Sequence, residues 1–252
     1  YHKKLVDIFR SANFLKKLSL DTIFIYYPSF RYIFSSKIAG IKNIKSYSIY
    51  KKKNLHLVYA AKKFTEKLLD IQNCPTETIL YVDPIKKERS KNEISKNKKN
   101  IILGVGSSGP TTRWGSKNFI GLIKRLNKDN DYFFYLLCGP GEEIISDEIL
   151  SQVEKGSCQS LNNKSISEVI PLISVCDIYI GNDSFGHHVS CQSSIPSYII
   201  MLDTPKAYTD YSKNQYRILP NDLNENYITH DSNISAESIT VDMVLNKIKN
   251  FI

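Results

Sequence analysis

The sequence predicts an α/β protein with two Rossmann-like units, of which the second is the more regular. In the second half, short apolar runs alternate with segments whose apolar residues recur at helical spacing. Small polar residues follow three of these runs directly, and a lysine-rich segment separates the two halves. Strands that alternate with helices along a chain form a parallel sheet with helices on both faces. With 252 residues, the chain is long enough for one large domain or two modest ones.

The elements of the second half follow from this periodicity in order. Apolar runs predict strands at residues 100–105, 132–138, 177–180 and 197–202. Helical spacing predicts helices at residues 116–128, 142–154, 165–175 and 184–193. We expect these elements to form a Rossmann-like domain over residues 100–234, followed by an amphipathic helix within residues 235–252.

The first half, residues 1–84, carries fewer regular signals. A strand is predicted at residues 21–27, and a helix at residues 29–39 ends before Gly40. A second helix is predicted at residues 55–70. Residues 85–99 are rich in lysine and offer almost nothing to bury, so we expect an exposed interdomain linker there. A long surface loop within one domain is the alternative.

Composition excludes several classes of protein. The five cysteines are scattered without metal-binding spacing, which is typical of reduced thiols in a cytosolic protein. No apolar run approaches the length of a spanning helix, and the start of the chain does not resemble a signal peptide. The first residue is Tyr1 rather than Met, which indicates a fragment.

The net charge of +9 is the remaining compositional signal. It comes without a nucleic-acid-binding motif, so no nucleic-acid partner is expected. A basic surface also suits an anionic membrane or a phosphorylated acceptor. The linker and the lysines at residues 51–53 are the segments that would make such a peripheral contact.

The most informative segment covers residues 177–188, where an apolar strand stops abruptly. Asn182, Asp183 and Ser184 follow the strand, and a pair of histidines lies in the next predicted helix. In parallel sheets, ligands bind beyond the carboxyl ends of strands, beside helix N-termini whose free N–H groups attract phosphate. Carboxylate, hydroxyl, amide and imidazole groups at this place favour a site for a phosphorylated polyol. Ordinary helix capping by Asp183 or Ser184 is the alternative.

Two further loops follow predicted strands. Residues 106–116 offer hydroxyl groups and a guanidinium before a helix, and such groups bind phosphate oxygens. The candidates in this loop are Ser107, Ser108, Thr111, Thr112 and Arg113. Residues 138–143 offer glycines for close backbone approach, and the carboxylates of Glu142 and Glu143 can accept hydrogen bonds from ribose hydroxyls. The alternatives are a polar loop with a capping serine and acidic residues that favour the helix dipole.

Taken together, three such loops on one rim suit the diphosphate, ribose and sugar of a nucleotide sugar. The segments SSGPTTRW, LLCGPGEE and KSISEVIPLISVCDIYIGNDSFGHHVS, in this order, resemble the C-terminal domain of glycosyltransferase family 9. This is the family of ADP-heptose:lipopolysaccharide heptosyltransferases, which have the GT-B fold of two Rossmann-like domains. The resemblance spans residues 100–220. It continues more faintly through YPSFRYIFSSKIAGIKNIKSYSIY and HLVYAAKKFTEKLLD in the first half.

The resemblance implies a role for each candidate residue. The hydroxyls of the first loop and Arg113 would lie by the donor diphosphate, and Glu142 or Glu143 would face the nucleoside. Asp183 and His188 would contact the pyrophosphate and the donor sugar. Their neighbours in the same motif complete the implied donor site: Asn182, Ser184, Phe185 and Gly186. His188 rather than His187 matches the family histidine, so we expect His187 to be a packed or exposed ring without a functional role.

The chain departs from the family pattern in three places. Thr112 stands where the family usually has a lysine, and Phe185 replaces a usual glycine. The family's N-terminal strand and Gly-Asp loop, whose aspartate is the proposed general base, have no counterpart before Asp21, and Asp7 lies in a helical context. The resemblance therefore implies a GT-B-like protein whose first domain is incomplete: either the chain is N-terminally truncated and lacks the segment of the general base, or it binds a donor without catalysing transfer.

The function that these patterns predict is transfer of a sugar, heptose or a related one, from a nucleotide-diphosphate donor such as ADP-heptose. The acceptor would be the lipopolysaccharide core or another bacterial surface glycan, carried on a glycolipid or oligosaccharide. We expect no metal and no cofactor, and a cytoplasmic location at the inner face of the inner membrane. The alternatives are a catalytically silent nucleotide-sugar-binding module and a GT-B-like sugar-nucleotide epimerase.

Overall fold

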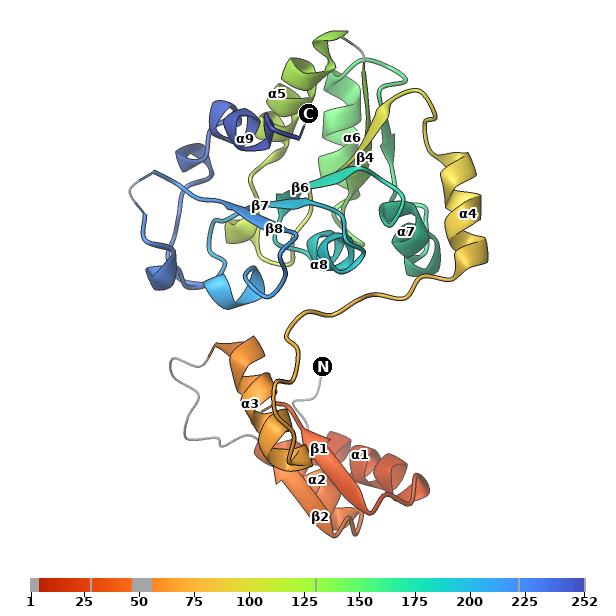
Figure 1. Ribbon diagram of the computed structural model, residues 1–252, viewed down its shortest axis with the longest axis vertical. Coiled ribbons are helices and arrows are strands. Elements are labelled where there is room, and N and C mark those ends of the chain that lie inside the picture. The colour runs from red at the N-terminus through yellow and green to blue at the C-terminus, as the bar shows by residue number, and fades with distance from the viewer. Residues whose placement is uncertain (1–4, 28, 47–55, 130, 222, 252) are drawn as a thin grey trace. The chain divides into compact units, whose positions relative to one another are not determined.

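The computed structural model describes residues 5–27, 29–46, 56–129, 131–221 and 223–251. These residues form two compact units, Tyr1–Thr76 and Glu77–Ile252 (Figure 1). The boundary lies before the one that the composition predicted. Residues 77–83 belong to the second unit, because the Leu80 amide donates to the Gln192 carbonyl at 2.9 Å and the Lys213 amide donates to the Glu77 carboxylate at 3.3 Å.

The first unit is a small α/β arrangement. Its elements in order are α1 (Leu5–Lys17), β1 (Thr22–Ile25), α2 (Phe30–Ile38), β2 (Asn43–Ser46) and α3 (Leu57–Leu69). The two strands pair in parallel, with Thr22 opposite Asn43. The predicted strand and both predicted helices are confirmed with shorter bounds, although Pro28 and residue 55 lie outside the described residues. Asp7 lies in α1, as its helical context predicts.

The second unit is built on six parallel strands. They are β3 (Lys99–Gly104), β4 (Tyr132–Leu137), β5 (Cys158–Ser160), β6 (Ile178–Asn182), β7 (Ser197–Ile200) and β8 (Gln215–Ile218). Their order across the sheet is β5-β4-β3-β6-β7-β8, which is the doubly wound order of a Rossmann fold. The four predicted strands are confirmed. The short, polar β5 and β8 lack the apolar run on which the prediction depended.

Helices cover both faces of this sheet (Figure 1). They are α4 (Pro84–Glu93), α5 (Ser116–Leu126), α6 (Glu143–Gln152), α7 (Ile166–Ile173), α8 (Phe185–Gln192) and α9 (Val241–Ile248). Alternate residues of β3 point to opposite faces. Ile101 and Leu103 join a core with apolar residues of α5, α6 and α9, whereas Ile102 joins a second core with residues of α7 and α8. α9 is shorter than the helix predicted at its position, and a single 3₁₀ turn, Ala236–Ser238, precedes it.

The predicted linker over residues 85–99 is the main correction to the predicted organisation. Residues 84–93 form α4, which is part of the second unit. Asp83 caps this helix, because its Oδ1 accepts from the Ile85 amide at 2.8 Å, and Pro84 occupies the first turn. Glu93 pairs with Lys164 at 3.0 Å. The lysine-rich composition concealed an Asp-Pro signal for the start of a helix.

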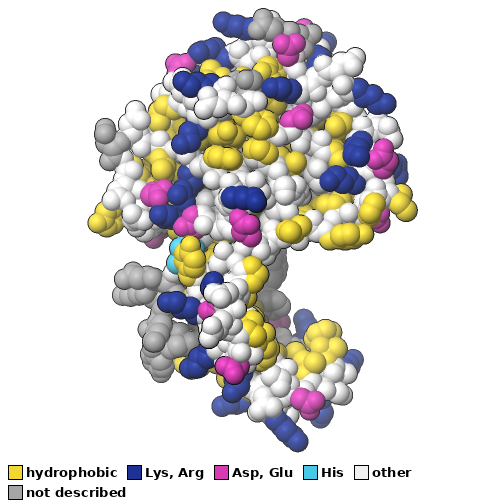
Figure 2. Space-filling model, in the orientation of Figure 1, with side chains coloured by type: hydrophobic (Ala, Val, Ile, Leu, Met, Phe, Trp, Pro, Cys, Tyr) yellow, Lys and Arg dark blue, Asp and Glu magenta, His cyan; other side chains and the backbone are white. Residues whose placement is uncertain are grey.

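Charges are mixed on the face that Figure 2 shows: basic and acidic side chains alternate over the second unit. On this face the basic side chains are therefore spread rather than gathered in one patch. None of the helices in the described ranges is both long enough and apolar enough to cross a membrane.

Two glycines set the spacing of the central strands. Gly104 of β3 lies opposite Gly181 of β6. A Cβ atom on Gly181 would lie 2.6 Å from the backbone of Gly104, and one on Gly104 would lie 1.8 Å from the Tyr179 hydroxyl. The close approach of these strands brings the ends of β3 and β6 together at the point where the strand order reverses.

We predict that Gly181→Ala lowers the free energy of unfolding by about 1–3 kcal/mol, because backbone atoms must move to admit the methyl group. Gly109→Ala is the matched control, since its Cβ would meet only ordinary contacts from 3.4 Å and its φ of −105° suits any residue. Denaturant unfolding of both variants checks this. Equal stability of the two variants would contradict the argument.

Candidate functional site

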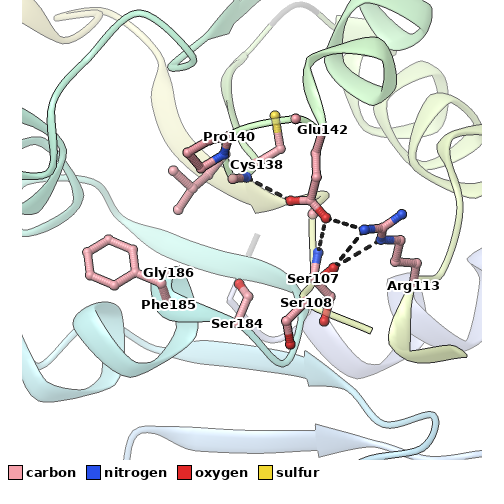
Figure 3. A pocket seen from close by; sticks show the side chains of 13 residues that line it. Ser107, Ser108, Arg113, Cys138, Pro140, Glu142, Ser184, Phe185 and Gly186 are labelled. Atoms are coloured by element: carbon pink, nitrogen blue, oxygen red, sulfur yellow. Dashed lines mark hydrogen bonds and ion pairs between the residues drawn. The ribbon is translucent and has the colours of Figure 1, made fainter. Parts of the chain in front are cut away.

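Three loops meet at the carboxyl ends of β3, β4 and β6 and enclose a cavity of about 490 Å³ (Figure 3). We call it the first cavity. Ligands of doubly wound sheets bind at this place, where the strand order reverses. The residues that line the first cavity are Gly106, Ser107, Ser108, Arg113, Leu137, Cys138, Gly139, Pro140, Gly141, Glu142, Ser184, Phe185 and Gly186.

The Glu142 carboxylate connects two of these loops. One oxygen, Oε1, accepts from the Ser107 amide at 3.1 Å and from the Arg113 guanidinium at 2.6 Å. The other, Oε2, accepts from the Gly139 amide at 2.7 Å. Charge-assisted hydrogen bonds are the strong ones, and this side chain is only 13% exposed. Glu142 therefore fixes the loop after β3 against the loop after β4.

Arg113 lies on the same side of the first cavity as Glu142 (Figure 3). Its Nε and Nη2 atoms donate to the Ser107 carbonyl at 3.0 and 2.9 Å. The guanidinium is 33% exposed and its charge is balanced by Glu142, so the pair adds no net charge to the cavity. Among the described residues, no acceptor engages its Nη1, which leaves two N–H groups for an anionic ligand.

The third side of the first cavity is the start of α8. The Ser184 side chain does not cap this helix, so it leaves the N–H groups of the first turn available as hydrogen-bond donors. Gly186 packs closely here, because a Cβ would lie 2.5 Å from the Leu137 side chain. The ring of Phe185 lies across the first cavity from Arg113 (Figure 3) and is 44% exposed.

A second cavity of about 360 Å³ adjoins the first. The two share Leu137, Cys138, Gly139, Pro140 and Phe185, so Phe185 borders both. The lining particular to the second cavity is largely apolar at its base and polar at its rim, and consists of Glu143, Leu161, Asn162, Lys164, Ile166 and Val169. Burial raises the pKa of the Cys138 thiol, so this side chain stays neutral. Its Sγ donates to the side-chain oxygen of Asn162, Oδ1, at 2.9 Å.

Asn182 is a structural brace behind the first cavity. Its side chain is fully buried, and its Oδ1 accepts from the Trp114 amide at 3.0 Å. Its Nδ2 donates to the Val105 carbonyl at 3.0 Å. The Trp114 indole is also buried and donates to the Ile239 carbonyl at 2.7 Å. Asn182 thus ties the end of β6 to the loop after β3.

Asp183 lines neither cavity and forms a cluster with two histidines. Its Oδ1 lies 2.8 Å from His187 Nδ1 and 3.5 Å from His188 Nε2. The His187 side chain is fully buried, as expected for a packed ring, and its Nε2 lies 2.6 Å from Gln215 Nε2. His188 Nδ1 lies 2.5 Å from the hydroxyl of Tyr211. Neither Tyr211 nor Gln215 was a candidate, because the segment around β8 carries no recognisable motif.

The environment of His188 keeps its imidazole neutral. Burial, followed by the neighbouring His187, lowers the pKa of His188 to about 4, although Asp183 opposes this shift. Burial raises the pKa of the Tyr211 phenol above its usual range, so the hydroxyl keeps its proton. A neutral His188 can then donate from Nε2 toward Asp183 and accept from Tyr211 at Nδ1.

Asp183, His187 and His188 are also the only group in the described part of the chain with the spacing of a metal site. Their ligand atoms lie within 4.8 Å of one another. The hydrogen bonds fit a metal poorly, because a metal ligand must offer a lone pair and His187 Nδ1 faces the carboxylate as a donor. The amide of Gln215 fixes that assignment from the other side of the ring.

The structure brings seven candidates together around the first cavity: Ser107, Ser108, Arg113, Glu142, Ser184, Phe185 and Gly186. Glu143 lines the second cavity instead. Thr111 is exposed, and Thr112 stands behind Ser107, with their hydroxyls 2.5 Å apart. The Ser107 hydroxyl also lies 3.1 Å from the Asp183 carbonyl, which links the first loop to the third.

We predict that Glu142→Ala lowers the free energy of unfolding by about 2–3 kcal/mol, because it removes the carboxylate that pairs with Arg113 and accepts from the partly buried amides of Ser107 and Gly139. Glu143→Ala is the control. Its carboxylate is exposed and accepts from the Gly141 amide at 3.0 Å, without joining two loops, so the melting temperature should stay nearly unchanged. Thermal unfolding compares the two, and a larger loss from Glu143→Ala would contradict the assignment.

His188 should make stability depend on pH. Its pKa is about 4 in the folded protein and about 6.5 in an unfolded chain, so the unfolded state takes up the proton first on acidification. We expect the contribution to be absent above pH 6.5, to destabilise the fold increasingly as the pH falls, and to level off near pH 4. The melting-temperature difference between wild type and His188→Asn should follow this curve. A constant difference would refute the shift.

Comparison with known proteins bears on this geometry. Residues 28–233 match the model of glycosyltransferase family 9 (heptosyltransferase). No curated protein sequence matches the chain. Among solved structures, the chain is similar to the ADP-heptose lps heptosyltransferase II of E. coli, with 19% identity, 98% of this chain and 81% of that chain covered, and a TM-score of 0.76.

Two further structures show the same likeness. A family 9 glycosyl transferase from Veillonella parvula has 13% identity and a TM-score of 0.77, with 99% of this chain and 80% of that chain covered. The E. coli heptosyltransferase WaaC with ADP has 13% identity and a TM-score of 0.69, with 99% and 79% covered. At these identities the likeness shows the fold, and the predicted GT-B-like α/β fold with parallel sheets is confirmed. The family match covers most of the chain, and the chain therefore belongs to glycosyltransferase family 9, the heptosyltransferase family.

Proposed function

We propose that the chain binds a nucleotide-diphosphate sugar in its two adjoining cavities and transfers the sugar, heptose or a related one, to an acceptor hydroxyl. The observation that carries the proposal is the convergence of hydroxyl, guanidinium and helix N-terminal groups beside an apolar cavity. A nucleotide sugar has the same division into an anionic centre and a flat, largely apolar base.

The first cavity suits the diphosphate. The N–H groups at the start of α8 and the hydroxyls of Ser108 and Ser184 can donate to phosphate oxygens, whereas the Ser107 hydroxyl already donates to the Asp183 carbonyl. The Nη1 of Arg113 adds a charged donor. In transfer, the acceptor oxygen bonds to the anomeric carbon while the bond from that carbon to the diphosphate breaks. These donors would stabilise the charge that develops on the leaving diphosphate, without a metal.

The second cavity suits the nucleoside. Its apolar base, formed by the buried Leu161 and Val169, can cover a nucleobase, and its rim offers the exposed Ile166 and polar groups to the base and ribose. Phe185 stands between the cavities with an exposed ring, so we place it in stacking contact with the nucleoside. ADP-heptose is the proposed donor, because solved relatives are described as heptosyltransferases with ADP or a fluorinated ADP-heptose.

The acceptor proposal rests on the relatives. One of them is described as a lipopolysaccharide heptosyltransferase, so we propose a lipopolysaccharide-core or other surface-glycan acceptor and a cytoplasmic location at the inner membrane. The basic character of the chain suits a peripheral contact with anionic lipid. The lysines at residues 51–53, which were expected to favour that contact, lie outside the described residues. No described residue that lines the cavities is assigned as the general base toward the acceptor.

Calorimetric titration with ADP, UDP, GDP and dTDP tests the proposal. We expect one diphosphate to bind in the micromolar range. Arg113→Ala should weaken that diphosphate about tenfold and leave the matching nucleoside unchanged, because only the diphosphate meets the guanidinium. Phe185→Gly should weaken the diphosphate and the nucleoside equally, because it removes a contact to the base.

Four outcomes would count against parts of this proposal. Absence of binding to all four diphosphates would refute the donor site. Equal loss of nucleoside and diphosphate in Arg113→Ala would remove that residue from its phosphate role. Tighter binding by Phe185→Gly would make the ring an obstruction rather than a contact. Binding of ADP-heptose without transfer to any acceptor would favour a silent binding module.

A further inference from the structure

The orientation of one side-chain amide fixes the protonation of a buried histidine. The Oε1 of Gln215 accepts from the backbone amides of Tyr211 at 3.0 Å and Ser212 at 2.9 Å. A backbone amide can only donate, so this atom must be the carbonyl oxygen of the side chain. The Nε2 of Gln215 is then the atom that faces His187, at 2.6 Å from the ring Nε2.

The His187 tautomer follows from this orientation. The Gln215 amide nitrogen carries only donors, so His187 Nε2 must be an acceptor without a proton. A neutral imidazole then holds its proton on Nδ1, which lies 2.8 Å from Asp183 Oδ1. The ring is fully buried, so water cannot take the place of either partner. The loop before β8 thereby dictates what His187 offers to Asp183.

The carboxylate is consequently asymmetric. Both histidines approach the same oxygen of Asp183: His187 Nδ1 lies 2.8 Å and His188 Nε2 lies 3.5 Å from Oδ1. Within the described residues no hydrogen bond engages Oδ2, and the side chain is 15% exposed. The backbone carbonyl of Asp183 lies 3.1 Å from the hydroxyl of Ser107, which lines the first cavity. One carboxylate oxygen is thus held by the protein while the other stays available to a ligand.

We propose that His187 is a positioning residue that, through its Nδ1–H, holds Asp183 with Oδ2 toward a hydroxyl of the donor sugar, and that Gln215 sets this tautomer. The assignment of Asp183 to the sugar rests on the proposed function. The role of His187 is additional to it, because the family resemblance assigns the functional histidine to position 188. An aliphatic side chain at position 187 would fill much of the same space but could not donate a hydrogen bond to Asp183.

The tautomer can be measured without any ligand. Nitrogen NMR of the imidazole rings should show the His187 proton on Nδ1 and no proton on Nε2. In Gln215→Glu, the new carboxylate presents an acceptor to Nε2, so His187 would lie between two carboxylates and hold protons on both nitrogens. A neutral wild-type ring with its proton on Nε2, or no change in Gln215→Glu, would overturn the relay.

Binding of ADP-heptose, with ADP as the comparison ligand, tests the positioning role. His187→Leu removes the donor, whereas His187→Asn keeps an N–H group near the place of Nδ1. We expect His187→Leu to weaken the binding of ADP-heptose about tenfold and to leave the binding of ADP unchanged. The variant loses the hydrogen bond that orients Asp183, and in the proposal Asp183 contacts only the sugar, which ADP lacks. His187→Asn should stay within about threefold of wild type.

The comparison separates positioning from a general loss of structure. A packing role alone would make both variants weaken ADP and ADP-heptose together and lower the melting temperature alike. Unchanged ADP-heptose affinity in His187→Leu would refute the proposal while the donor site stands. Wild-type protein that binds neither ligand would refute the proposed function and, with it, the role of His187 toward the sugar.

Discussion

The carboxylate of Glu142 is the interaction on which the shape of the site depends. Strand ends alone do not determine the course of the loops that follow them. Glu142 binds the amides of Ser107 and Gly139 and the guanidinium of Arg113, and in doing so joins the loops after β3 and β4. The buried amide of Asn182 joins the loop after β3 to the end of β6 in the same way. The cavity is therefore enclosed by loops that are fixed to one another before any ligand arrives.

The sequence predicted the architecture well where hydrophobic patterning is strong. The four apolar strands of the central sheet and the helices between them lie where periodicity placed them, because burial on both faces demands continuous apolar runs. It failed for β8, whose polar residues lie at the sheet edge, and for α4, whose start depends on Asp83 and Pro84 rather than on an apolar stripe. The capping residues determine where such a helix begins, and the overall composition of the segment does not reveal them.

The sequence predicted which loops form the candidate site but not which residue in them makes which contact. Residue types and loop positions identified the three loops, because carboxyl ends of parallel strands share one edge. They could not distinguish Glu142 from Glu143, since only the backbone course decides which carboxylate turns inward. They also could not identify Gln215, which reaches His187 from β8 through contacts that no local motif records.

The ion pair between Arg113 and Glu142 has a consequence for turnover. Because the pair is neutral, the first cavity would attract the proposed diphosphate chiefly through oriented dipoles, whose field falls off more steeply with distance than that of an uncompensated charge. Such a field gives little long-range capture, but it also retains the spent nucleotide weakly. In the proposed reaction, a cavity whose charges compensate each other would favour rapid departure of the leaving nucleotide over tight storage of the donor.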